Sequence, residues 1–207
     1  IRGTRAGAQQ KQGALVFFAG GIFSFAGSQD HRRRTPRDPE AQTRRLVQRA
    51  LRDPCAQATR ACRGVYSNGV RQTAYRHWHN VSDVHIVSAG LVNYRERVQA
   101  SRYCLHTEGN GFGARISDYM ALGCVPLIVN DEMRLPLEKV LPYDAFAVRA
   151  AKADIPQRLL PRLRRLPLKK LQDGVAHFSD AFVWWGEGRA YEYVLANIAL
   201  STGSAYL

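Results

Sequence analysis

The stretch Ser101–Val129 decides the fold, and it reads SRYCLHTEGNGFGARISDYMALGCVPLIV. It begins with the apolar segment Tyr103-Cys104-Leu105 and ends with the apolar segment Val125–Val129. Between them lie a glycine-rich loop and a helix-length segment that Gly123 ends in the position of a C-cap. Short apolar runs of this length are typical of buried strands. A strand, a helix and a second strand in this order predict two parallel strands of one sheet.

The same alternation of apolar runs and helix-like segments continues on both sides of this stretch. Strands are expected at 14–18, 83–89 and 145–148, and helices at 40–51, 94–100, 114–122 and 136–140, from 154 toward 165 with a kink at Pro161, and from 168 onward. The expected fold class is therefore α/β, a Rossmann-like parallel sheet with helices on both faces. We expect residues 1–13 to be a flexible lead-in and residues 14–207 to form a single domain, helical from 168 to 207.

The chain is strongly basic. Its 207 residues include 30 Lys and Arg against 17 Asp and Glu, a formal net charge of +13, which favours anionic partners such as nucleic acid, membrane surfaces, nucleotide phosphates or acidic sugars. Much of this charge lies in two sets: Arg32, Arg33, Arg34, Arg37, Arg44, Arg45, Arg49 and Arg52, then Arg158, Arg162, Arg164, Arg165, Lys169 and Lys170. We interpret both sets as solvated surface. They lack the interleaved aromatic residues of a nucleic-acid site, so nucleic acid is not an expected partner.

The four cysteines do not follow a zinc-binding pattern. Cys55 and Cys62 are close enough in sequence to close a small disulfide loop. Cys104 and Cys124 fall on neighbouring expected strands, where either a disulfide or two buried thiols would fit. The sequon Asn80-Val81-Ser82 gives mild support for a lumenal location. No apolar run approaches the ~20 residues of a membrane-spanning helix.

The loop between the strand and the helix of Ser101–Val129 is the expected ligand site. In a parallel sheet of this kind, ligands bind beyond the carboxyl ends of the strands, where this loop lies. Gly109, Gly111 and Gly113 let the backbone approach a ligand closely, and the helix that follows offers free N–H groups to a phosphate. Arg115 is placed to contact a diphosphate and Asp118 to accept hydrogen bonds from ribose hydroxyls.

Ser101–Val129 also resembles the signature of exostosin-type glycosyltransferases. The matching residues are Cys104, Leu105, Gly109, Gly111, Gly113, Arg115, Asp118, Gly123, Cys124 and Pro126. Residues 15–21 resemble the first strand of this domain in the family, and residues 66–72 with 78–80 are similar to its plant-type members. The resemblance spans roughly residues 14 to 150 and is dense in the middle.

This resemblance implies the C-terminal, donor-binding domain of a GT-B glycosyltransferase, with the N-terminal domain absent from the chain. It implies a nucleotide-sugar donor, taken to be a UDP-sugar, and a glycan or glycoprotein acceptor, with no further cofactor, no metal site and inversion at the transferred carbon. It also implies the Golgi lumen, with a membrane anchor in the full-length precursor. The alternative is a truncated, non-catalytic exostosin domain that binds nucleotide or a partner subunit.

Several residues outside the core of the motif complete the expected site. The donor-binding set includes Gly20 after the first strand, Arg71, and Asp131, which with Glu132 has turn chemistry as its competing explanation. Asn110 stands where the wider fold class has an acidic residue. Glu108 is the local candidate for the catalytic base, with capping of the next helix as its alternative. The remaining aromatic and histidine candidates are interpreted structurally, namely His106 as a strand-end residue and Phe182, Trp184 and Trp185 as packing or domain-interface residues.

Overall fold

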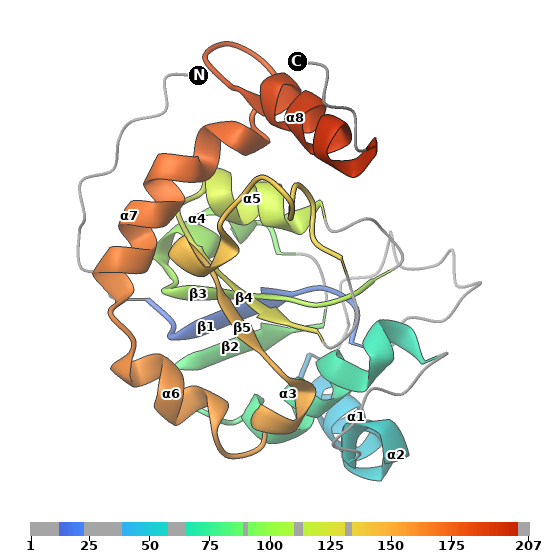
Figure 1. Ribbon diagram of the computed structural model, residues 1–207. Coiled ribbons are helices and arrows are strands. Elements are labelled where there is room, and N and C mark those ends of the chain that lie inside the picture. The colour runs from blue at the N-terminus through green and yellow to red at the C-terminus, as the bar shows by residue number, and fades with distance from the viewer. Residues whose placement is uncertain are drawn as a thin grey trace.

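The computed structural model describes residues 13–22, 39–57, 65–88, 91–109, 114–130 and 134–202. Its centre is a five-stranded sheet in the order β2-β1-β3-β4-β5, and every neighbouring pair is parallel (Figure 1). The strands are β1 Val16–Ala19, β2 Val84–Val87, β3 Tyr103–His106, β4 Val125–Val129 and β5 Val148–Ala150. The α/β, Rossmann-like fold class is therefore confirmed.

Helices cover both faces of this sheet, with α4 and α5 above it and α3 below it in Figure 1. The α-helices are α1 Pro39–Arg52, α2 Pro54–Gln57, α3 Val70–Trp78, α4 Tyr94–Ala100, α5 Arg115–Ala121, α6 Leu159–Arg165, α7 Leu168–Phe178 and α8 Ala190–Thr202. Short 3-10 helices are η2 Tyr66–Gly69, η3 Tyr143–Ala145, η4 Lys152–Asp154 and η5 Ser179–Phe182. None of the described helices is both long and apolar enough to cross a bilayer.

The strands are buried on both faces, which explains why they are continuous apolar runs. On β1, Phe17 belongs to the apolar cluster of Val98 on α4 and Tyr119 on α5. Its neighbour Phe18 points to the opposite face and belongs to the larger cluster, which includes Trp78 of α3. Successive side chains of a strand alternate between faces, so a strand with helices on both sides needs apolar residues at every position.

The unit β3–α5–β4 is fastened at its closed end. Gly123, at φ 72°, ends α5, with the N–H of Gly123 donating to Met120 O and the N–H of Cys124 donating to Tyr119 O over 2.9 Å. This is the hydrogen-bond pattern of a Schellman C-cap, which favours glycine. Cys124 then forms a disulfide with Cys104 on β3, with 5.9 Å between the Cα atoms. Of the two states that fit these cysteines, the structure has the disulfide.

Three elements differ from the sequence-based expectation. Residues 136–140 form turns rather than a helix, because Leu137 has a left-handed backbone at φ 56°. Pro161 lies in the first turn of α6, where its missing N–H is tolerated, and so it does not kink the helix. The last strand is 148–150 rather than 145–148, since Val148 to Ala150 pair with β4 while the preceding residues form η3.

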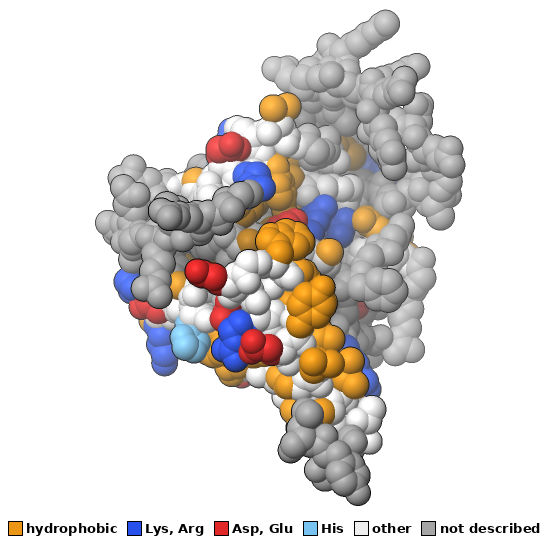
Figure 2. Space-filling view, turned by 90° about the horizontal axis from the view of Figure 1, so that it is seen from above, with side chains coloured by type: hydrophobic (Ala, Val, Ile, Leu, Met, Phe, Trp, Pro, Cys, Tyr) orange, Lys and Arg blue, Asp and Glu red, His pale blue; other side chains and the backbone are white. Residues whose placement is uncertain are grey.

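The C-terminal part is helical as expected, but its two tryptophans are not core residues. Phe182 is buried, whereas Trp184 and Trp185 are 46% and 79% exposed, so the expectation of packing holds for Phe182 alone. The Trp184 ring contacts the ring of Tyr191 on α8 edge to face. Figure 2 shows hydrophobic side chains gathered on this side of the molecule, where Tyr191 and Leu195 of α8 are exposed. Cys55 is disulfide-bonded, and Cys62, its expected partner, lies outside the described residues.

Candidate functional site

The order of the strands defines a switch point between β1 and β3. From β1 the chain continues to β2 on one side, whereas β3, β4 and β5 follow one another on the other side. In doubly wound sheets the loops after two such strands diverge and leave a crevice at their carboxyl ends, where ligands bind. Here Gly20 and Gly21 follow β1, and Thr107 to Gly109 follow β3.

Arg71, near the start of α3, holds the two sides of this crevice together. Its guanidinium donates from Nη1 to Gly21 O after β1 over 3.0 Å, and from Nε and Nη2 to Thr107 Oγ1 and Glu108 O after β3 over 2.8 and 3.0 Å. Nη1 also donates to the hydroxyl of Tyr66. Burial lowers the pKa of Arg71, an effect that Tyr66 opposes and the like charge of Arg115 adds to. A buried guanidinium with this many partners is a rigid, fixed positive charge.

A strained turn places Arg71. Ser67 and Asn68 both have left-handed backbones, at φ 58° and 48°, immediately before α3. Asn68 donates through Nδ2 to the carboxylate of Glu108, so the turn is tied to the loop after β3. Left-handed backbone costs roughly 1–2 kcal/mol for each such residue, and it persists where the surroundings impose it. Strain of this kind is common at ligand sites.

Arg115 brings a second positive charge to the same crevice. It is the first residue of α5, and its Cζ lies 5.1 Å from the centre of the Phe18 ring, the same distance as Cζ of Arg71. A Cβ atom added at Gly20 would lie 2.4 Å from Nη2 of Arg115, so the guanidinium needs the glycine. Nη1 of Arg115 is buried without a hydrogen-bond partner in the described structure.

His106, the last residue of β3, lies close to both arginines. It is 1% exposed, and neither ring nitrogen has a hydrogen-bond partner among the described residues. Burial, together with the positive charges of Arg115 and Arg71, lowers the pKa of His106 to about 4. The imidazole is therefore neutral near pH 7 and has one donor and one acceptor to offer. Buried polar atoms without partners are rare and often mark the place of a ligand.

The other predicted site residues fall into three groups. Gly109 is at the crevice, since a Cβ there would lie 2.9 Å from Nη2 of Arg71. Glu108 is half-buried beside it, whereas Asp118 is exposed on α5, one turn after Arg115. Four predicted donor-binding residues lie outside the described residues, as does Glu132: Asn110, Gly111, Gly113 and Asp131.

The sequence analysis missed the supporting residues of Arg71. α3 was not predicted, and Tyr66, Asn68 and Thr107 were not singled out as contacts. A Ser-Asn-Gly turn followed by apolar residues at 70, 74, 75 and 78 was the available signal for a helix after a turn. No group of three or more His, Cys, Asp or Glu side chains suited to a metal ion occurs in the described part of the chain.

Fold and site together define a doubly wound α/β domain with a basic crevice at its switch point. The chain belongs to the exostosin family of glycosyltransferases, because the Exostosin GT47 domain matches it over residues 5–166. The resemblance seen in the sequence is thereby confirmed, and the domain is a glycosyltransferase domain.

Curated relatives are similar over part of the chain. A probable glucuronosyltransferase, GUT1 of Oryza sativa subsp. japonica, is 28% identical over 95 residues, which cover 45% of this chain and 23% of the relative. The probable glycosyltransferase At3g07620 of Arabidopsis thaliana is 27% identical over 130 residues, 59% of this chain and 28% of the relative. The probable beta-1,4-xylosyltransferase IRX10 of Arabidopsis thaliana is 26% identical over 95 residues, 45% of this chain and 23% of the relative. The chain thus matches about a quarter of the length of these relatives.

Proposed function

We propose that the crevice between β1 and β3 holds a nucleotide-sugar donor, a UDP-sugar, whose sugar is transferred to a glycan or glycoprotein acceptor. The observation that carries the proposal is the meeting of two guanidiniums and a buried histidine without hydrogen-bond partners at the switch point of a glycosyltransferase domain. A diphosphate supplies the negative charge that the arginines lack and the hydrogen-bonding oxygens that His106 lacks.

Each residue has a distinct role in this proposal. Arg115, with a buried nitrogen without a partner, contacts the diphosphate, and Arg71 supplies a fixed charge while it holds the loops after β1 and β3 in place. His106 donates a hydrogen bond to a donor oxygen in its neutral form. Asp118 binds the ribose, and the loop from Gly109 to Gly113 faces the phosphates.

The same charges explain how the reaction is helped. When the bond between the sugar and the diphosphate breaks, negative charge grows on the leaving UDP. Fixed positive charges in a water-poor crevice stabilise that charge without reorganising. We propose on this ground that transfer is metal-independent and needs no cofactor besides the donor, and that the sugar carbon is inverted.

Glu108 is the proposed catalytic base, a role that its position supports. Its carboxylate accepts a hydrogen bond from Asn68 beside Arg71 and is half-buried at the crevice. Glu108→Gln keeps the contact with Asn68 possible and removes the base. We expect kcat to fall at least tenfold while UDP affinity changes less than twofold. A variant with wild-type kcat would remove Glu108 from this role.

The names of the relatives and the disulfides inform the partners and the location. A glucuronosyl and a xylosyl transferase among the relatives support a hexose or pentose as the transferred sugar. The Cys104–Cys124 disulfide forms and persists in oxidising compartments, which supports the Golgi lumen as the place of action. Membrane anchoring of the full-length precursor is part of the same proposal.

Calorimetric titration with UDP tests the donor site. Arg115→Ala and Asp118→Ala should each weaken UDP binding about tenfold or more, whereas Arg165→Ala, an exposed arginine on α6, should not. Unchanged affinity in the first two variants, with an intact circular dichroism spectrum, would place the nucleotide elsewhere. UDP release from UDP-glucuronic acid or UDP-xylose with mixed acceptors then separates a transferase from a domain that holds nucleotide without turnover.

A further inference from the structure

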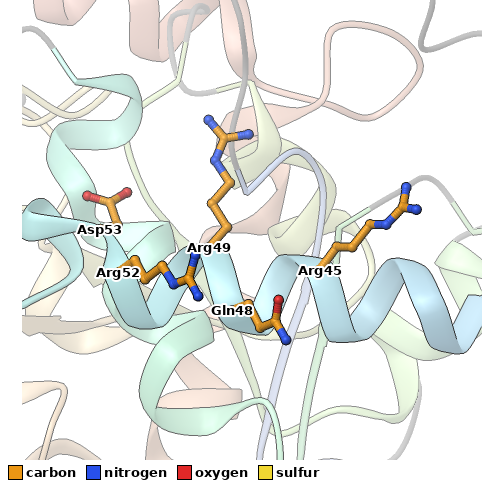
Figure 3. Close-up of a pocket in the computed structure, with 5 residues that line it drawn as sticks. All are labelled: Arg45, Gln48, Arg49, Arg52 and Asp53. Atoms are coloured by element: carbon orange, nitrogen blue, oxygen red, sulfur yellow. The ribbon is translucent and has the colours of Figure 1, made fainter.

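Helix α1 has two faces of opposite character. Val47 and Leu46 pack against the main apolar core, and Ala50 is fully buried. The outer face carries exposed polar and basic side chains from its last turns, and these border a hollow of about 530 Å³ together with the residue that follows the helix (Figure 3). The described lining residues are Arg45, Gln48, Arg49, Arg52 and Asp53.

The charge of this face is not balanced locally, unlike the charge elsewhere on the described surface. On other elements the basic side chains meet acids, as in the ion pairs Arg149–Glu138 and Arg164–Asp83. Arg45 and Arg52 form no ion pair with any described residue. Three arginines against one aspartate leave the lining with a charge of +2.

The one carboxylate in the lining is already engaged. Asp53 accepts a hydrogen bond from the N–H of Cys55 over 2.8 Å, at the start of α2. Like charges on one helix face repel each other, and an anionic ligand relieves this repulsion. The face is therefore suited to hold an anion that comes from outside the described chain.

We propose that this arginine face of α1 binds an acidic polysaccharide through the carboxylates of its uronic acids. From Arg45 to Arg52 the helix rises about 10 Å, so the guanidiniums form a row that fits a linear polymer with repeated negative charges. Guanidiniums match carboxylates with paired hydrogen bonds, and the amide of Gln48 suits sugar hydroxyls. The lining contains no aromatic ring on which a base could stack and no apolar side chain to enter a lipid layer.

The face is connected to the donor crevice through α3. Arg76 of α3 donates through Nη1 to Ala50 O of α1, and Arg71 lies five residues earlier on the same helix, about 7.5 Å along its axis. A polysaccharide on α1 therefore lies within reach of the crevice as an acceptor chain. This role as acceptor rests on the proposed transferase function, whereas binding of the polysaccharide does not.

The test compares two triple variants of the whole chain that remove equal charge. Arg45→Gln/Arg49→Gln/Arg52→Gln empties the arginine face, and Arg158→Gln/Arg165→Gln/Lys170→Gln removes three exposed charges from α6, α7 and the residue before α6. Binding to polygalacturonate is measured without donor at about 0.05 M salt, where surface charges are weakly screened. The first variant should bind about tenfold more weakly, and the second should change less than twofold.

Other outcomes overturn the proposal. Equal losses in both variants would show a general effect of net charge, and no loss in the first would show that α1 is a solvated face. Single-stranded DNA and vesicles with anionic lipid are measured in parallel, and loss of either with polygalacturonate binding intact would assign the face to that partner. UDP affinity should be unchanged in the first variant, so a failure of the donor site and a failure of the α1 site are told apart.

Discussion

His106 gives the sharpest quantitative prediction, because its environment ties the stability of the fold to pH. In the unfolded chain its pKa is near 6.5, whereas burial and the charges of Arg115 and Arg71 lower it to about 4 in the fold. Between these two values the unfolded state binds a proton that the folded state refuses, so stability falls as pH falls. At about 1.4 kcal/mol for each pH unit, the loss between pH 7 and pH 4 is about 3 kcal/mol.

The perturbation is His106→Leu, and the assay is urea unfolding from pH 7 to pH 4. The variant should lose about 3 kcal/mol less than the wild type over this range, since leucine does not titrate. At pH 7 it should be as stable as the wild type or more stable by about 1 kcal/mol, because two buried nitrogens without partners disappear. His177→Leu, at an exposed position on α7, is the control and should keep the wild-type dependence on pH. If wild type and His106→Leu lose the same free energy, the account of His106 is refuted.

Three further changes test the scaffold around the crevice. Arg71→Lys keeps the charge but not the planar fork that reaches both loops, and urea unfolding should show a loss of about 2–3 kcal/mol; a loss under 0.5 kcal/mol would contradict the clamp. Gly20→Ala places a methyl group against Arg115 and should weaken UDP binding about fivefold in calorimetry, whereas Gly21→Ala, with open space at its Cβ, should not. Replacing the bonded pair by Cys104→Ala/Cys124→Ala opens a loop with a sequence separation of 20 and should lower the unfolding free energy by about 3 kcal/mol; a midpoint equal to that of the oxidised wild type would count against it.

The parts of the fold that follow from local pattern were predictable from the sequence. β4 and α4 have the boundaries expected, Val125–Val129 and Tyr94–Ala100, since an uninterrupted apolar run and a helical run define them. Helix α3 was missed, because its buried face includes Arg71 and Gln72, which a hydrophobic pattern does not count. The left-handed Leu137 was equally hidden, since leucine carries no preference for that conformation.

The candidate site was predictable as a place and less so as a set of contacts. Arg115 and Gly20 were expected at one ligand site, and the structure puts them side by side. The hydrogen bonds of Arg71 to Gly21 and Thr107 cross 50 and 36 residues of chain, so they depend on how α3 packs against the sheet. The burial of His106 has the same origin, because β4 and α5 close around the end of β3 only in the folded domain.

A crystal structure of this chain with bound UDP tests the central claim most directly. The account predicts the diphosphate at the carboxyl ends of β1 and β3, with an oxygen within hydrogen-bond distance of Arg115 and another donor atom within hydrogen-bond distance of His106. A nucleotide bound elsewhere, for example against the arginine face of α1, with the crevice between β1 and β3 empty, would contradict it.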